Sequence, residues 1–251
     1  MIDSQPPPAV TADQMREVDR AMVDDFGIDL ISMMENAGRN LAWLARDRFL
    51  DGDAIGKYVT VLAGRGGNGG GALVCARHLH NWGCDVTVTV TVPAERFAPV
   101  PARQLAILNA MGLPVVAVPP AEPSSLVIDG IIGYSLSRAP HGTSAELVRW
   151  ANDQSAPVLS LDLPTGLDPT TGEAFDPTVR AAATLTLALP KTGLYADSAL
   201  EFAGELYLAD IGVPPALYAR PPLGLEVGRV FARSEIVRLK PPFRPDGSNR
   251  T

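Results

Sequence analysis

Apolar residues recur every three or four positions in the first fifty residues, a spacing typical of amphipathic helices. A first helix is predicted over residues 11–25, where Thr11 and Gln14 have the form of a capping box. A second helix is predicted over Leu30–Phe49, and Gly27 separates the two. The chain is therefore expected to begin with two helices, each with one apolar face.

From residue 58 onward the pattern changes to short apolar runs separated by stretches with helical periodicity. Tyr58–Ala63 is an uninterrupted, β-branched run of the kind found in strands that are covered on both faces. Further strands are predicted over Asp85–Val92, Pro114–Val118, Leu126–Ile132, Pro157–Leu163, Ala182–Leu189 and Glu205–Ala209, and helices over Ala72–Trp82, Gln104–Met111 and Ser144–Asn152. Strands that alternate with helices favour an α/β fold, in which a mostly parallel sheet has helices on both faces.

No break between two domains is visible in this alternation. We expect one domain over residues 11–239. An extended N-terminal arm over residues 1–10, with three consecutive prolines, would precede it, and a mobile tail over residues 240–251 would follow it.

Composition and charge exclude several classes of protein. The 251 residues are 46% hydrophobic and 20% charged, which is enough apolar mass to bury a core and excludes a disordered or fibrous chain. A net charge of -7 gives no general attraction to nucleic acid or to an anionic membrane, so neither is expected as a partner. The two cysteines cannot form a disulfide framework, and the N-terminus lacks the pattern of a secretory signal, so a cytoplasmic location is expected.

A glycine-rich run follows the first predicted strand, with six glycines between Gly64 and Gly71. Such a turn lets backbone N–H groups approach an anion, and a following helix adds a favourable partial charge. The run matches the spacing of a dinucleotide-binding fingerprint, but Asp85 and Glu95 are both misplaced for the expected ribose contact. It also lacks the Lys-Ser/Thr pair of a P-loop, and a purely structural turn stays open as an alternative.

Two aspartates lie at the ends of apolar strands. Asp129 stands inside the run LVIDGII, and Asp162 ends the run PVLSLD. Because ligands of parallel sheets bind beyond the carboxyl ends of the strands, both carboxylates are candidates for one site, with loop bracing as the alternative. Lys191 follows a later strand and could reach a phosphate or lie in solvent. The three histidines show no spacing typical of a metal site.

Five motifs, in the order MMENAG, GRGGNGGGALVCARHL, VIDGIIG, LDLPTG and ALPKTGL, resemble the NAD(P)H-hydrate epimerase family, also called the YjeF N-terminal domain. The resemblance covers residues 11–215. It implies a three-layer αβα Rossmann-like fold and a homodimer. The implied activity is isomerisation between the R and S forms of hydrated NADH or NADPH, damaged cofactors that carry a hydroxyl on C6 of the nicotinamide ring. A separate dehydratase acting on the same metabolite is an implied partner.

The resemblance also implies roles for individual residues. Asp129 is similar to the family's key acid, here a candidate general acid/base near a potassium ion, and Asn68, Asp129 and Thr165 resemble the potassium ligands. Thr165 replaces a serine, and either hydroxyl suits a hard cation. The implied substrate-binding residues are Gly67, Asn68, Gly69, Gly70, Gly71, Gly133, Tyr134, Ser135, Leu136, Ser137, Arg138, Ala139 and Asp162.

The glycine-rich run departs from the family pattern at two positions. The family usually reads GNNGGDG where residues 66–72 read GGNGGGA, so Gly67 replaces an asparagine and Gly71 replaces an aspartate. A carboxylate that would contact the ligand is therefore missing. We weigh an epimerase against a non-catalytic nucleotide-binding or dimerisation module on the same fold. A short-chain dehydrogenase is disfavoured because the sequence has no Tyr-x-x-x-Lys pair.

Overall fold

The computed structural model describes residues 7–239, so the predicted tail at 240–251 lies outside the described residues. One eight-stranded sheet forms the centre, in the order β3-β2-β1-β4-β5-β6-β7-β8. The strands are β1 Tyr58–Ala63, β2 Asp85–Val90, β3 Val115–Val116, β4 Leu126–Gly130, β5 Val158–Leu161, β6 Ala183–Leu187, β7 Glu205–Ala209 and β8 Ile236–Arg238. Within the described residues β8 alone runs antiparallel, which confirms the predicted mostly parallel α/β sheet.

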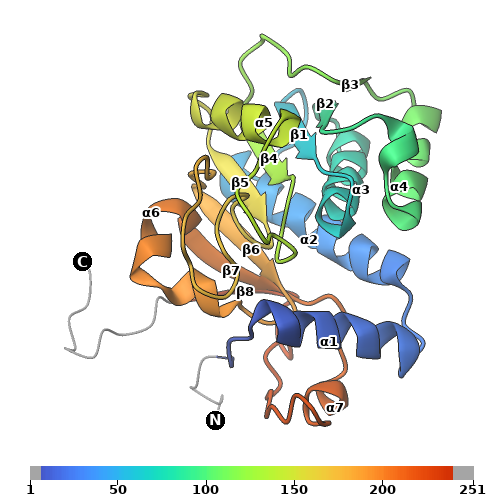
Figure 1. The fold of residues 1–251 in the computed structure, drawn as a ribbon. Helices are drawn as coiled ribbons and strands as arrows, with labels where there is room; N and C mark the ends of the chain where they lie inside the picture. Colours follow the sequence, from blue (N-terminus) through green and yellow to red (C-terminus); the bar gives the residue numbers. More distant parts are fainter. Residues whose placement is uncertain (1–6, 240–251) are drawn as a thin grey trace.

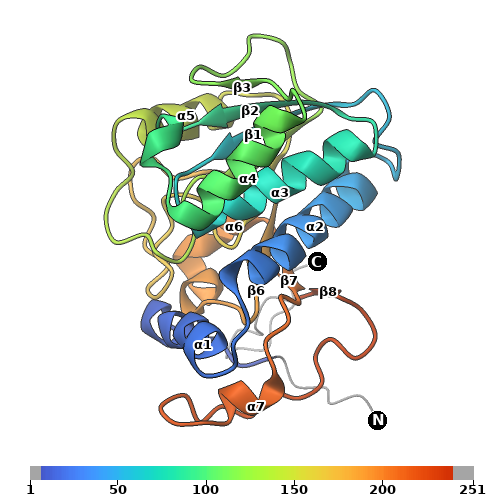
Figure 2. The ribbon, with the colours of Figure 1, turned by 90° about the vertical axis from the view of Figure 1, so that its right-hand side faces the viewer.

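Helices cover both faces of this sheet, as expected for three layers (Figures 1 and 2). They are α1 Ala12–Asp24, α2 Leu30–Phe49, α3 Gly67–Asn81, α4 Pro99–Ala110, α5 Thr143–Asn152, α6 Leu200–Ala203 and α7 Pro215–Tyr218. The helices α2, α3 and α4 share a core with one face, and α5 and α6 pack against the other. No helix within residues 7–239 combines the length and apolar character needed to cross a membrane.

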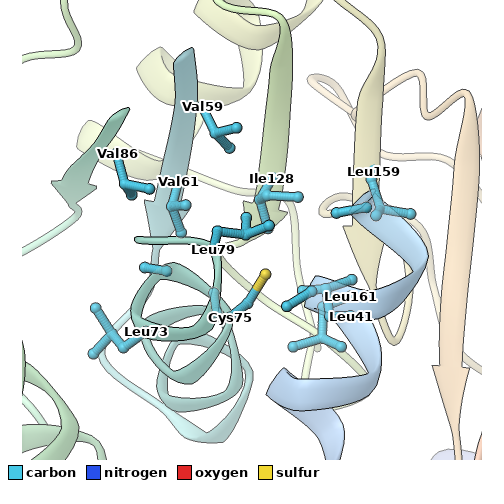
Figure 3. Close-up of a cluster of buried hydrophobic side chains, with 14 of the residues drawn as sticks. Leu41, Val59, Val61, Leu73, Cys75, Leu79, Val86, Ile128, Leu159 and Leu161 are labelled. Carbon is cyan, nitrogen blue, oxygen red and sulfur yellow. The ribbon is translucent and has the colours of Figure 1, made fainter. Parts of the chain in front are cut away.

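The side chains of the central strands alternate between these two cores. Val61, Ile128 and Leu161 point toward α2 and α3, as Figure 3 shows, whereas Leu62 and Val127 pack toward α5. All five side chains are 0% exposed. Burial on both faces explains why these strands read as continuous apolar runs rather than as alternating ones.

The start of α3 differs from the prediction. The helix begins at Gly67 rather than at Ala72, so the prediction that the glycine-rich run is a loop before the helix was wrong for its second half. A Cβ at Gly69 would lie 1.7 Å from the backbone oxygen of Gly64. Glycine is therefore required where the first turn of α3 packs back onto the end of β1, although its intrinsic helix propensity is low.

The helix α1 lies beyond the carboxyl ends of β6 and β7, where its apolar face shares a core with α7. The predicted capping box of Thr11 and Gln14 is present at its start. Val10, just before α1, is fully buried and pairs in parallel with Lys191. The packed domain thus includes Val10, which the sequence placed in the arm, because its backbone is hydrogen-bonded on both sides of Lys191.

Candidate active site

A cavity of about 250 Å³ lies at the carboxyl ends of β1, β4, β5 and β6. The chain leaves β1 toward β2 and leaves β4 toward β5, in opposite directions along the sheet, so the cavity sits at the switch point of the strand order. One wall is apolar and comes from α1 and α2, with Met15, Met33, Met34 and Ala37. The facing wall comes from the ends of the strands and from the start of α3, and it carries the polar side chains Asn68, Asp162 and Lys191 among apolar ones.

The start of α3 forms one polar edge of the cavity, where Gly67, Asn68 and Gly71 line it. The first N–H groups of a helix have no partner inside the helix, so they attract an anion. Gly70 is not part of the lining, and a Cβ there would lie 2.7 Å from the sulfur of Met34. Of the predicted substrate-binding residues, the cavity brings together Gly67, Asn68, Gly71, Gly133, Tyr134, Ser135 and Asp162. It does not bring Gly69, Gly70, Leu136, Ser137, Arg138 and Ala139 to its lining.

Asp162 projects into the cavity from the end of β5. Its backbone has φ of +67°, a left-handed conformation that aspartate tolerates better than most residues and that turns the side chain out of the sheet. The Tyr134 backbone N–H donates to Asp162 Oδ2 at 2.9 Å. A Cβ at Gly133 would lie 2.8 Å from the same oxygen, so only glycine leaves room beside the carboxylate.

Lys191 forms an ion pair with Asp162 and is itself 0% exposed. Its Nζ donates to Asp162 Oδ1 and, at 2.9 Å, to the backbone oxygen of Leu187. The alternative in which Lys191 is solvated was therefore wrong. Its ammonium group lies among Asp162, Thr186 and Leu187, and the backbone on both sides of Lys191 pairs with Val10.

Asp129 is fully buried next to this cavity, and its carboxylate is not part of the lining. Its oxygens accept hydrogen bonds from the Ser160 hydroxyl at 2.9 Å, from the Thr165 N–H at 2.9 Å and hydroxyl at 2.7 Å, and from the Ile131 N–H at 3.2 Å. Burial raises the pKa of Asp129, and these hydrogen bonds act in the opposite direction. Its role as an acid/base stays a prediction, and the geometry favours a role in fixing Thr165.

Oxygen atoms suited to a hard cation gather around Thr165. Its hydroxyl lies 2.7 Å from Asp129 Oδ1 and 3.2 Å from the Ile132 backbone oxygen. Asn68 lies beside Gly133, with its Oδ1 3.0 Å from a Cβ built there, and its amide nitrogen is buried without a partner among the described residues. Residues 7–239 contain no group of three or more His, Cys, Asp or Glu that could hold a metal ion. Hydroxyl, carbonyl and carboxylate oxygens are the donors that a potassium ion takes, so the residues present fit that ion.

The four side chains implied as site residues lie around the segment that follows β4, but only Asn68 and Asp162 line the cavity. Asn68 and Asp162 both approach Gly133, at 3.0 and 2.8 Å from a Cβ built there. Thr165 accepts from the Ile132 N–H at 3.0 Å and binds Asp129. The segment that follows β4 thus contacts all four.

Asp19 was missed by the sequence analysis, although it lines the cavity from α1. The Tyr134 hydroxyl donates a hydrogen bond to its carboxylate. Burial raises the pKa of Asp19, and burial followed by the nearby Asp19 charge raises the pKa of Tyr134. The available signal was the position of Asp19 four residues after Met15, which places a carboxylate on the apolar face of the helix.

The strand order and the cavity at its switch point place the chain among the Rossmann-like α/β proteins. Residues 30–193 match the family described as YjeF-related protein N-terminus, and the chain belongs to this family, which confirms the resemblance. A relative from Dehalogenimonas lykanthroporepellens, named NAD(P)H-hydrate epimerase, is 44% identical over 92% of each chain.

Two further comparisons extend this result. A relative from Salinibacter ruber, named bifunctional NAD(P)H-hydrate repair enzyme Nnr, is 33% identical over 85% of this chain and 42% of its own length. The crystal structure of yeast ynu0, YNL200c, superposes with a TM-score of 0.79 and 26% identity, covering 92% of this chain and all of that one. The three-layer fold is therefore shared with a solved structure.

Proposed function

We propose that this chain is an NAD(P)H-hydrate epimerase, an isomerase that interconverts the R and S forms of hydrated NADH or NADPH. The observation that carries the proposal is the cavity that places the Asp162–Lys191 ion pair beside the start of α3. The relatives that bear this name cover most of the chain and support it.

The size of the cavity fits the damaged part of such a substrate. At about 250 Å³ it is smaller than the roughly 300–1,000 Å³ of pockets that enclose drug-sized ligands. It would therefore hold the hydrated nicotinamide ring against the methionines of α1 and α2, while the rest of the dinucleotide lies outside. In this pose the free N–H groups of Gly67 and Asn68 bind a phosphate at the start of α3.

The residues around the ring divide into two groups in the proposal. Asp162 contacts the substrate, and Lys191 keeps its carboxylate in place. Asn68, Asp129 and Thr165 would hold a potassium ion, which supplies positive charge beside the substrate. Asp129 orients Thr165 through two hydrogen bonds, and the acid/base role expected for it is tested below.

The test is an epimerisation assay on one purified hydrate of NADPH. We expect the protein to convert it to the other epimer, separated by chromatography, faster than the reaction without protein. Asp162→Asn should lose this activity, because the amide cannot pair with Lys191 as the carboxylate does. Asp153→Asn, an exposed change at the end of α5, is the matched control and should retain it. Equal rates with and without the wild-type protein would reject the proposed function.

The second candidate is a non-catalytic nucleotide-binding or dimerisation module, and the glycine at position 71 favours it. A module of this kind would bind the hydrate, for example in calorimetry, but leave its configuration unchanged.

We also propose that the chain forms a homodimer, and light scattering tests its oligomeric state. Cell fractionation tests the proposed cytoplasmic location. An assay that couples the epimerase to a dehydratase tests the proposed separate partner.

A further inference from the structure

We propose, on the basis of the proposed function, that Asp19 and Asp162 are a pair of proton-transfer groups on different walls of the cavity, with Tyr134 setting their separation. Asp19 comes from α1 and Asp162 from the end of β5, and both line the cavity. The comparisons with relatives do not assign a role to Asp19.

Tyr134 connects the two carboxylates. Its backbone N–H donates to Asp162 Oδ2 at 2.9 Å, and its hydroxyl at the other end of the side chain donates to Asp19. Because one tyrosine is hydrogen-bonded at both ends, the carboxylates are held apart by the length of that residue. Tyr134 itself lines the cavity between them.

The two carboxylates have different electrostatic surroundings. Asp162 pairs with the buried ammonium group of Lys191. Asp19 forms no ion pair among the described residues, and burial is the largest influence on its pKa, which is raised. Burial therefore favours the neutral, proton-donating form of Asp19, whereas Asp162 has a cation directly beside it. Two carboxyl groups with such different surroundings are typical of an acid/base pair.

The charged and titratable groups near Asp19 come from each element that packs around it. Tyr134 follows β4, and its hydrogen bond lowers the pKa of Asp19. The Lys191 charge also lowers this pKa, whereas the Asp162 charge raises it. Arg16 on α1 and Tyr218 on α7 lie close enough to be coupled to Tyr134 and Asp19, respectively.

Inversion at C6 requires chemistry on both faces of the ring. The C6–O bond breaks as the lone pair of N1 forms a C6=N1 double bond, and the hydroxyl leaves as water with a proton from Asp19. A water molecule then adds to the opposite face of C6, the double bond returns to N1 as a lone pair, and the added water gives its proton to Asp162. The steps balance without an oxidant or reductant, and proton exchange with solvent returns Asp19 and Asp162 to their starting forms before the next turnover. One carboxylate on a single face could not complete both steps.

The test compares Asp19→Asn with Asp24→Asn, an exposed carboxylate on the same helix. We expect Asp19→Asn to lower kcat for epimerisation by about 100-fold or more while KM stays nearly constant, since general acid–base groups contribute roughly 10²–10⁴-fold. Asp24→Asn should match the wild type. In the direction in which Asp19 donates, the wild-type rate should fall as pH rises through the pKa of Asp19, and this limb should be absent in Asp19→Asn.

Tyr134→Phe provides a second and independent readout. It removes the hydrogen bond that lowers the pKa of Asp19, so the limb should move to higher pH, a shift that a purely structural contact would not produce. An active wild type with unchanged kcat in Asp19→Asn, or with no shift of the limb in Tyr134→Phe, would overturn this inference and leave the proposed function intact. An inactive wild type would reject the proposed function itself.

Discussion

The ammonium group of Lys191 and the carboxylate of Asp162 form an ion pair in which neither side chain is more than 3% exposed. Each group would be costly to bury alone, because the interior cannot replace the water that solvates a charge. Each of the two groups therefore holds its partner in position at the base of the cavity. Since Lys191 also donates to the Leu187 backbone oxygen, the pair connects the ends of β5 and β6.

Lys191→Met should destabilise the fold. The change leaves the Asp162 carboxylate buried without a cation, which typically costs about 3–5 kcal/mol of the free energy of unfolding. Urea unfolding of the wild type and the variant measures this loss in the free energy of unfolding. Lys57→Met is the control, because its partner Asp51 is exposed and such pairs contribute about 0–1 kcal/mol. Similar losses of unfolding free energy in Lys191→Met and Lys57→Met would contradict the larger contribution predicted for the buried pair.

Thr165→Val should lower the free energy of unfolding by about 1–3 kcal/mol, since it leaves the Ile132 N–H and one Asp129 oxygen without their hydroxyl partner. Thr165→Ser keeps the hydroxyl and should be milder. If the same hydroxyl helps to hold potassium, the wild type should melt at a higher temperature in potassium chloride than in tetramethylammonium chloride. Persistence of that difference in Thr165→Val would argue against Thr165 as a ligand.

Asp129→Asn tests the expected acid/base role and the effect of burial together. If the role is correct, interconversion of the two hydrates should stop, and unchanged rates would remove Asp129 from the mechanism. Because burial raises the folded-state pKa of Asp129 above the unfolded value of about 3.9, its contribution to stability is present at low pH and is lost as pH rises through the folded pKa. The stability difference between wild type and Asp129→Asn should therefore shrink from about pH 4 upward, as urea unfolding at several pH values would show.

Gly71→Asp restores the carboxylate that the family usually has. A Cβ at this position would lie 2.8 Å from Leu161 Cδ2, so the buried leucine must shift, and we expect a loss of about 1–3 kcal/mol of stability. Gly71→Ala introduces the same contact without the charge and is the matched control. In the epimerisation assay Gly71→Asp should have a lower KM than Gly71→Ala, because the carboxylate adds a contact to the ligand. Equal KM values would show that position 71 does not reach the substrate.

The sequence predicted those elements whose pattern of burial is regular. The bounds of β1 and α2 agree with the predicted Tyr58–Ala63 and Leu30–Phe49, because a fully buried strand and a long amphipathic helix each have an unambiguous pattern. The start of α3 was missed because consecutive glycines have low helix propensity. The strand β8 was missed because a three-residue edge strand depends on its pairing with β7.

The site was predictable to a similar extent. Asp129 and Asp162 were recognisable as polar residues at the ends of apolar strands, and both contact the segment that follows β4. The sequence could not show that Asp129 turns away from the cavity or that Lys191 is enclosed. Both features depend on the side chains that pack around Asp129 and Lys191. The sequence pattern of a single strand does not indicate which residues from other elements will lie against it.

The pairing of Val10 with Lys191 has a practical consequence for anyone who shortens this protein. A chain trimmed to begin at Thr11 would keep every helix and strand, yet it would lose the backbone partner of Pro190 and Thr192. The backbone on both sides of Lys191 would then be unpaired at this point. We expect such a truncation to keep the circular dichroism spectrum of the full chain and still lose catalytic activity, so Val10 belongs in any version used for enzymology.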